Sequence, residues 1–594
     1  MPAENERRPG SAPRLDRAAM PDGNAAGHLL IAGLALLLPL LLYQVRHLDD
    51  NSLTSWQWVF QLADPWRLFL GLALLAPLCW LLALLPEWLG RGGGVLGGVR
   101  PMLLLPGLAF LACLPFLDTP EVIVDAARYF LQAKAVSEYG PVWFFREWGR
   151  EIFAWTDLPL IPLLYGLILN LFEQSRLAVQ LFNALLFSLT ALLIVVLGRD
   201  LWDEETGVAG ALLFLGFPYL YSQTPLLLVD IGTMFFLLLA MVALHRAMVR
   251  GGFCYPALCA LAVAAVLLSK YSAWLLLSGL LPVVGCSLEA GRRPALRRAA
   301  LALLPALLLV LPIFWYYREV MAGQIALLLE FQKPGLAGWS ESLTSTLLFQ
   351  THPLLTAALF YSLYRAGRLR DLRYLILLWP VLLLLVLLEI RRIRYSIPVF
   401  PLLALLAAYG LRDLAVPALR RHLLLVVAGS SLLLAGAGFL PFLQTMSARN
   451  LQQAGRYLDT LAVEGVEVMV LPASRPVMDP RVSVPLLDLF TSRPLAYRQI
   501  HPPEIPPWVA TSSLRFTWEL PLAPFYATLS DSTWPRALVL IMPGDAAELP
   551  PEISEKIQGL ELMGRFAAHS GIFQHRTLVE VYGSPPGHYP WLNP

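Results

Sequence analysis

The feature that most constrains this chain is a series of long apolar stretches, which follow one another from Gly27 to about Leu443. A helix needs about 20 apolar residues to cross a bilayer core roughly 30 Å thick, and each stretch is about that long. The chain of 594 residues is 57% hydrophobic and 14% charged, which is too apolar for a soluble protein of this size. The sequence therefore predicts a polytopic all-α membrane protein.

About thirteen membrane-spanning helices fit these stretches. Arginines gather in the loops on one side of the arrangement, whereas the short turns on the other side carry few. Loops rich in Lys and Arg stay in the cytoplasm, so the N-terminus is expected there, and the odd number of spans places the C-terminal part on the extracytoplasmic side of the cell inner membrane. The predicted spans are residues 28–46, 67–86, 101–117, 176–198, 207–222, 231–248, 254–269, 271–289, 297–317, 344–364, 374–390, 395–411 and 422–443.

The chain is predicted to have three parts. Residues 1–26 carry Pro, Gly and mixed charges and are expected to form a disordered cytoplasmic tail. Residues 27–446 form the transmembrane domain, whose outer loop at 118–175 is expected to contain interfacial helices. Residues 447–594 have no long apolar run and indicate a small extracytoplasmic α/β domain. Its predicted elements are a helix at 450–461 and strands at 466–471, 536–541 and 576–582.

Charged residues on the predicted outer side point to an anionic ligand. The net charge of +2 gives no concentrated basic surface, so a nucleic-acid partner is excluded. A charged side chain at mid-membrane costs about 2.5–3.5 kcal/mol, so it usually has a partner or a function. Interfacial anchoring explains one arginine more easily than three. The basic residues that break the charge bias are Lys270, Arg391, Arg392 and Arg394.

Acidic residues occur on the same predicted side. In the outer loop, helical spacing would put Glu121, Asp125 and Arg128 on one face. Asp157 follows an aromatic patch later in that loop, and Asp230 interrupts an apolar sequence. Structural interpretations stay open beside a functional one. Asp230 could simply cap a helix, Lys270 could reach to the headgroups, and residues 128–155 could form an amphipathic helix lying flat on the membrane.

Five short motifs then occur in a recognisable order. They are Asp125-Ala126-Ala127-Arg128-Tyr129, Asp157-Leu158-Pro159-Leu160, Asp230 with Phe235-Phe236, Ser269-Lys270-Tyr271, and Arg394-Tyr395-Ser396-Ile397-Pro398-Val399-Phe400-Pro401. The series resembles the GT-C superfamily of polyprenyl-phosphate-sugar-dependent glycosyltransferases, over roughly residues 100 to 445. The most similar branch contains protein O-mannosyltransferases and lipid A aminoarabinose transferases. The chain departs from that branch in having Ala126 where an acidic residue is frequent, and in having two extra spans before the outer loop.

The resemblance implies an enzyme and assigns roles to its residues. The donor would be a sugar on a polyprenyl phosphate held in membrane lipid, and the acceptor a protein, lipid or glycan. Protein glycosylation and lipopolysaccharide modification both fit. Asp125 would act as general base in an inverting transfer, and burial is expected to raise its pKa toward the working range. The expected catalytic residues are Asp125, Asp157 and Asp230, and the expected substrate-binding residues are Arg128, Tyr129, Lys270, Arg391, Arg394 and Tyr395.

A metal remains an open possibility in this interpretation, and so does a different activity. Asp125, Asp157 and Asp230 could supply oxygen ligands to a divalent cation such as Mg or Mn, and no other cofactor is implied. The main alternative is a transporter or flippase of a lipid-linked substrate, which often shows related halves, and no internal repeat is evident. An acyl- or phosphotransferase would call for a nucleophile or His-rich motif, which the loops do not contain.

Overall fold

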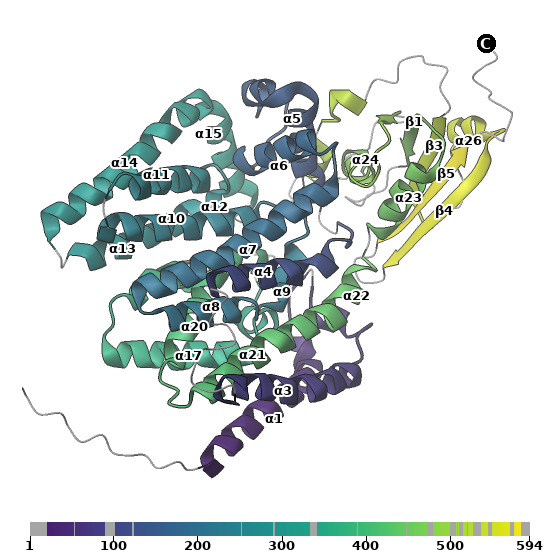
Figure 1. The fold of residues 1–594 in the computed structure, drawn as a ribbon. Helices are drawn as coiled ribbons and strands as arrows, with labels where there is room; N and C mark the ends of the chain where they lie inside the picture. The colour runs from purple at the N-terminus through teal and green to yellow at the C-terminus, as the bar shows by residue number, and fades with distance from the viewer. Residues whose placement is uncertain are drawn as a thin grey trace, which may run out of the picture.

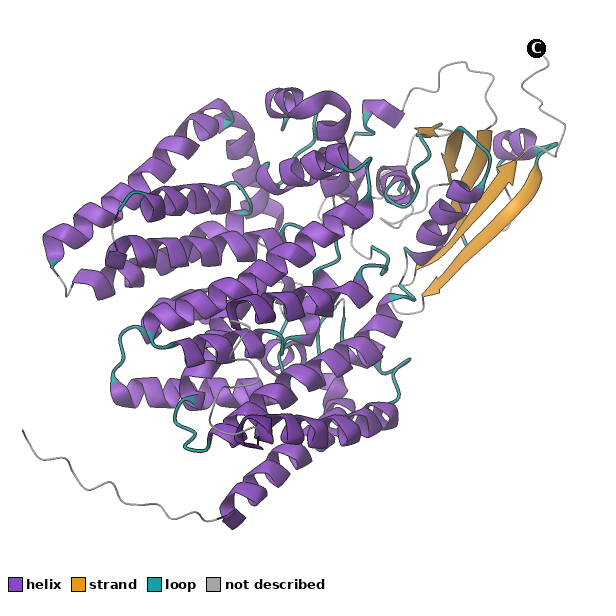
Figure 2. Ribbon diagram, viewed as in Figure 1, coloured by secondary structure: helices purple, strands orange, loops and turns teal. Residues whose placement is uncertain are grey.

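The structure is a computed structural model, and it is mainly helical with one small sheet near the C-terminus (Figures 1 and 2). The apolar stretches form a bundle of packed helices, and the sheet lies at one end of that bundle. The structure describes residues 21–52, 54–88, 101–121, 124–250, 252–288, 291–332, 341–388, 390–446, 448–471, 479–498, 507, 509, 515–519, 521–526, 536–544, 549–570 and 575–583.

The helices of the bundle run from residue 21 to residue 443. In the first half they are α1 (Pro21–Val45), α2 (Trp56–Val59), α3 (Pro65–Trp88), α4 (Pro101–Cys113), α5 (Asp125–Glu147), α6 (Leu160–Leu171), α7 (Arg176–Leu201), α8 (Glu204–Phe214), α9 (Pro218–Gln223) and α10 (Asp230–Arg250). In the second half they are α11 (Cys254–Leu267), α12 (Tyr271–Leu276), α13 (Leu280–Ser287), α14 (Arg292–Tyr316), α15 (Arg318–Leu327), α17 (Pro353–Leu369), α18 (Tyr374–Leu382), α19 (Ile393–Ser396), α20 (Phe400–Leu411), α21 (Pro417–Leu434) and α22 (Leu440–Leu443).

Every predicted span overlaps one or more of these helices, but the count of thirteen is not established. Within the described residues, 7 helices are long and apolar enough to cross a membrane by length and composition. Further apolar helices are shorter, as α6 and α11 are. The helix α1 begins at Pro21, inside the segment predicted as a disordered tail, and residues 1–20 of that tail lie outside the described residues.

The predicted flat interfacial helix at 128–155 differs from what the structure contains. The helix α5 spans Asp125–Glu147 and is interrupted at Gly140, which has a φ of +83° and directly precedes Pro141. Its residues 126–136 are all buried, because α6 packs along one side and the C-terminal helix α24 (Pro480–Asp488) along another. The first half of α5 is therefore enclosed by protein rather than spread on a membrane surface.

The C-terminal part contains a mixed five-stranded sheet in the order β2-β1-β3-β5-β4. β1 is parallel to both β2 and β3, whereas β5 is antiparallel to β3 and to β4. The predicted helix and the three predicted strands coincide with α23, β1, β3 and β5. The bounds are α23 (Arg449–Thr460), β1 (Gly465–Val470), β2 (Leu495–Tyr497), α25 (Phe516–Glu519), β3 (Arg536–Pro543), α26 (Pro551–Ile557), β4 (Glu561–Ser570) and β5 (His575–Gly583).

A buried ion pair joins this part to the bundle. Lys134 of α5 contacts Asp488 of α24 at 2.6 Å, and the hydroxyl of Tyr526 donates to the same carboxylate at 2.6 Å. Burial raises the pKa of Asp488, and Lys134 opposes that shift. Since breaking a buried pair leaves an uncompensated charge, this contact fixes the C-terminal part against α5.

Candidate functional site

Three aspartates and three basic residues alternate in one continuous network at the end of the bundle nearest the sheet. Arg394 donates from Nη1 to Asp125 at 2.7 Å and from Nε to Asp230 at 2.9 Å. Lys270 contacts the other oxygen of Asp230. On the other side of Asp125, Arg128 lies 3.2 Å from its Oδ1 and makes a two-pronged contact with Asp157, of which the Nη2 to Oδ1 distance is 2.8 Å. The order is Asp157, Arg128, Asp125, Arg394, Asp230, Lys270.

Helix ends place these side chains. Asp125 is the first residue of α5, and Arg128 follows it by one turn on the same face. Asp230 is the first residue of α10, and Lys270 directly precedes α12. A carboxylate in the first turn of a helix is stabilised by the positive end of the helix dipole. The local sequence therefore favours both aspartates before any tertiary contact forms.

The network brings together residues that lie far apart in the sequence, as the predicted site requires. Asp125 and Arg394 are 269 positions apart, and Lys270 and Asp230 are 40 positions apart. One expected neighbour is missing. Glu121 precedes α5 and pairs with Arg176 at 3.0 Å, so it does not share a face with Asp125 and Arg128. The expectation was wrong because α5 begins only at Asp125.

Asp125 is the most accessible of the three aspartates. Its side chain is 21% exposed, against 3% for Asp157 and 1% for Asp230. Among the basic residues, Lys270 is 13% exposed and Arg394 is 7% exposed. A ligand that enters this network therefore meets Asp125 and Lys270 first.

The pKa of Asp125 is shifted in the direction opposite to the one predicted. Burial alone would raise this pKa, but the charges of Arg394 and Arg128 and the hydrogen bond from Arg394 lower it well below its usual range. The prediction considered burial and not two guanidinium groups, whose combined effect exceeds the desolvation penalty. In this state Asp125 is firmly ionised and is a weak base.

Asp157 is held by more groups than its ion pair. The amide of Gln132 donates to Asp157 Oδ2 at 2.9 Å, and the amide of Gln324 donates to the backbone carbonyl of Asp157 at 3.0 Å. The hydroxyl of Tyr271, next to Lys270, donates to Gln324 at 2.6 Å. These contacts hold Asp157 in place beside Arg128.

Two tyrosines of the predicted binding set lie beside the basic residues. The Lys270 ammonium lies 4.2 Å from the centre of the Tyr395 ring, and the Arg128 guanidinium lies 5.2 Å from that of Tyr129. Such contacts hold a cation in place without neutralising it. The third basic residue of the set, Arg391, donates from Nε to the carbonyl of Leu385 at 3.5 Å.

The three aspartates do not form a metal-binding cluster. Within the ranges that the structure describes, no three His, Cys, Asp or Glu side chains are grouped so that they could hold a metal ion. Arg128 lies between Asp157 and Asp125, and Arg394 lies between Asp125 and Asp230. A cation site would require the carboxylates to face one another, so these residues do not fit one.

Sequence reasoning missed a further buried acid beside the site. Glu341 is 4% exposed and accepts the backbone N–H of Ile393 at 2.7 Å. Burial raises the pKa of Glu341 to about 8, against the opposing effects of that hydrogen bond and of Arg392. No motif marks Glu341 in the sequence. Gln132, in contrast, follows Arg128 by four positions on one helix and could have been found from that spacing.

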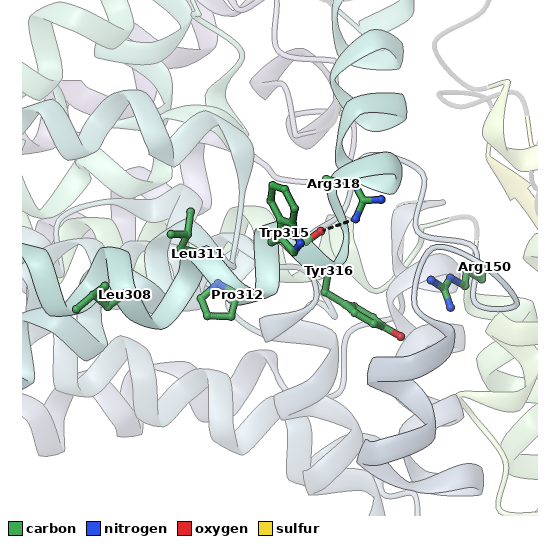
Figure 3. A pocket seen from close by; sticks show the side chains of 7 residues that line it. All are labelled: Arg150, Leu308, Leu311, Pro312, Trp315, Tyr316 and Arg318. Carbon is green, nitrogen blue, oxygen red and sulfur yellow. Dashed lines mark hydrogen bonds between the residues drawn. The ribbon is translucent and has the colours of Figure 1, made fainter.

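A large hollow on the bundle lies elsewhere. It has a volume of about 830 Å³ and lies along α14 and the start of α15, where Trp315, Tyr316, Arg150 and Arg318 surround it (Figure 3). The side chain of Phe314, on another face of α14, packs on Trp274 near Lys270. This hollow contains no acidic partner for its arginines among its lining residues, and none of the six network residues lines it.

The middle of the chain matches a known family. Residues 157–317, which include Asp157, Asp230 and Lys270, match the sequence model of a family described as dolichyl-phosphate-mannose-protein mannosyltransferase. No curated protein sequence matches the chain.

Solved structures share the fold over most of the chain. The chain is similar to ArnT from Cupriavidus metallidurans bound to undecaprenyl phosphate, with 14% identity and a TM-score of 0.52 over 82% of this chain and 98% of that one. The apo structure of the same protein has 14% identity and a TM-score of 0.52, over 81% of this chain and 97% of that one. A third structure is the archaeal oligosaccharyltransferase AglB from Archaeoglobus fulgidus, which has 12% identity and a TM-score of 0.42 over 75% of this chain and 69% of that one. This likeness is too distant to support an inference.

These findings confirm the resemblance to the GT-C superfamily of glycosyltransferases that the five motifs predicted. The chain is a multi-pass membrane protein with a fold similar to that of ArnT. At 14% identity this structural likeness establishes the fold and does not identify the donor or the acceptor.

Proposed function

We propose that the protein transfers a sugar from a polyprenyl-phosphate donor to an acceptor at the extracytoplasmic face of the cell inner membrane, with its N-terminus in the cytoplasm. The observation that carries this proposal is the buried network that opens at Asp125 and Lys270. Guanidinium and ammonium groups bind phosphate as they bind carboxylate, so a donor phosphate can replace a carboxylate at Lys270 and Arg394. The similar structure that contains undecaprenyl phosphate supports a carrier of this kind.

The proposed transfer is a single displacement that inverts the anomeric carbon. The acceptor oxygen or nitrogen attacks this carbon as its bond to the phosphate oxygen breaks, and the carrier leaves as polyprenyl phosphate. The proton of the acceptor passes to Asp125. Lys270 and Arg394 neutralise the charge that develops on the leaving phosphate, which is the largest electrostatic demand of the step.

Donor binding would also activate the base. In the resting network Arg394 and Arg128 keep the pKa of Asp125 low. A phosphate that takes up the charge of Arg394 would weaken that ion pair and raise the pKa of Asp125 toward a value useful for proton transfer. Arg128 would stay with Asp157, which has further contacts to hold it. Asp125 would thus become an effective general base only when the donor is bound.

The test is turnover by the purified full-length protein with a panel of polyprenyl-phosphate sugars. Asp125→Asn should lower kcat by about 10²–10⁴-fold, the usual contribution of a general base, while the protein still folds. Asp118→Asn is a matched control, because Asp118 lies in the same loop with a side chain that is 67% exposed. Normal transfer by Asp125→Asn would remove Asp125 from the base role, and movement of lipid-linked sugar across vesicles without transfer would favour a flippase instead.

A further inference from the structure

A second set of buried polar contacts lies in the loop between α1 and α3. Asp49 in this loop is 3% exposed. Its carboxylate accepts the backbone N–H of Trp56 at 2.7 Å and the hydroxyl of Ser345 at 2.6 Å. The amide of Gln350 lies 3.3 Å from the same group. Asp49 therefore both organises its own loop and reaches a segment almost 300 positions later in the chain.

Two neighbours of Asp49 strengthen this junction. Asp50 accepts the backbone N–H of Ser342 at 2.9 Å. Trp56 is fully buried, and its indole N–H donates to the carbonyl of Phe349 at 3.0 Å. The loop thus satisfies backbone groups at both ends of residues 342–350, where an unsatisfied buried group would be costly.

Residues 341–350 in turn hold the segment that carries Arg394. Glu341 accepts the N–H of Ile393 at 2.7 Å, and the hydroxyl of Thr346 donates to the carbonyl of Arg391 at 3.4 Å. Ile393 is the first residue of the short helix α19, whose first N–H groups have no partner within the helix. Glu341 supplies that partner one residue before Arg394.

We infer that the described residues 49–52 and 54–60 of this loop are a positioning element of the site, which acts through residues 341–350 to fix the backbone at Arg394. The positioning residues are Asp49 and Trp56 in this loop and Glu341 in residues 341–350, and none of them touches Asp125 or Asp230 in the described contacts. The loop belongs to the two N-terminal helices that precede the part resembling the GT-C branch. The consequence for donor use rests on the proposed function, whereas the consequence for the backbone does not.

Hydrogen exchange of the full-length protein in nanodiscs tests the inference without any substrate. Asp49→Asn places an amide N–H₂ among groups that donate to Asp49, so exchange at residues 341–350 and 391–396 should both accelerate by at least about fivefold, the effect of one lost buried hydrogen bond. Asp64→Asn is the matched control, since Asp64 accepts the N–H of Trp66 at the start of α3 in an exposed position. Its exchange at both segments should equal that of the wild type.

Acceleration confined to residues 341–350, or no acceleration at all, would overturn the inference. If Asp49→Asn does not fold, Trp56→Phe decides the question, because it keeps an aromatic ring at this position and removes the donor to Phe349 together with part of the buried indole. At the acid itself, Glu341→Gln retains an acceptor for Ile393 and should preserve wild-type exchange, whereas Glu341→Ala should not. Equal exchange in these two variants would also count against the inference.

A kinetic measurement separates positioning from the reaction. With an active polyprenyl-phosphate sugar, Trp56→Phe should lower kcat/KM for the donor by about fivefold, because it disturbs the placement of Arg394, which is proposed to bind the donor phosphate and to stabilise the leaving group. Unchanged kcat/KM with faster exchange at 391–396 would mean that Arg394 does not serve the donor. That outcome would contradict the proposed function while leaving the structural coupling intact.

Discussion

Two regions of this protein display arginines, and they differ in what surrounds the charge. In the network, the side chain of Arg394 is 7% exposed and is bound by two carboxylates. Along the hollow of α14, which Figure 3 shows with Arg318 at its edge, Arg318 is 57% exposed. It pairs with Glu319, which is itself 87% exposed. The first arrangement has lost its hydration and is compensated by protein, whereas the second is compensated mainly by solvent.

The comparison shows why the larger hollow is not the candidate site. The hollow offers volume and aromatic surface, and exposed cations beside such surface commonly mark a headgroup region. In the network, each charge has an opposite partner that a ligand could replace. Ordered, replaceable charge is what a leaving phosphate needs, so the two regions should respond very differently to mutation.

The largest expected effect comes from removing the acid between two buried cations. Asp230→Ala leaves Lys270 without its carboxylate partner and Arg394 with Asp125 alone, so the protein should lose about 3–5 kcal/mol of stability. A lower thermal midpoint of the detergent-solubilised protein would report this loss. If Asp230→Ala has the same thermal midpoint as the wild type, Asp230 does not stabilise the protein by neutralising Lys270 and Arg394.

A smaller effect should appear in the pH dependence of stability. The pKa of Glu341 in the folded protein is about 8, above its ordinary value of 4.5. The folded protein therefore keeps a proton that the unfolded chain loses, and the stability contributed by protonated Glu341 is full below pH 4.5 and declines as the pH rises through 8. Glu341→Gln should remove this decline, so the stability difference between wild type and variant should change between pH 5 and 8.

Glu319→Gln is the matched control for that measurement. Glu319 lies in the exposed region and its side chain is 87% exposed. Its pH profile of stability should run parallel to that of the wild type. If the pH profile of stability of Glu341→Gln also runs parallel to that of the wild type, the pKa of Glu341 is not raised in the folded protein. The buried and exposed regions would then not differ in this respect.

The smallest expected effect is in the exposed region itself. Arg318→Ala removes a side chain that contacts Glu319 at 3.0 Å on an exposed surface, and such pairs contribute about 0–1 kcal/mol. The thermal midpoint and the sugar-transfer rate should both stay close to those of the wild type. A loss of stability comparable to that of Asp230→Ala would break the comparison.

Much of this arrangement could be predicted from the sequence, because local signals are strong in a membrane protein. The lengths of the apolar stretches located the helices. Lys270 and Arg394 stood out because they lie on the predicted outer side, against the tendency of Lys and Arg to occur in cytoplasmic loops. The motifs also pointed to Asp125, Asp157 and Asp230. All five residues lie in one network.

The rest depends on tertiary contacts that no local pattern encodes. The pKa of Asp125 was predicted in the wrong direction partly because Arg394 comes from a distant part of the chain, 269 positions away, whereas Arg128 lies one turn along the same helix and its charge was left out of the prediction. Glu121 was placed on the same helix face as Asp125 and Arg128 because the start of α5 could not be located to the residue. Glu341 has no sequence signal, since its role comes from a single backbone contact to Ile393.

The most direct test of the account is the affinity of the protein in nanodiscs for undecaprenyl phosphate. Lys270→Ala should weaken binding by at least about tenfold, the effect of one lost charge-assisted hydrogen bond, whereas Arg318→Ala should bind as the wild type does. Equal affinity of Lys270→Ala and the wild type, or a loss confined to Arg318→Ala, would contradict the claim that the network receives the donor phosphate.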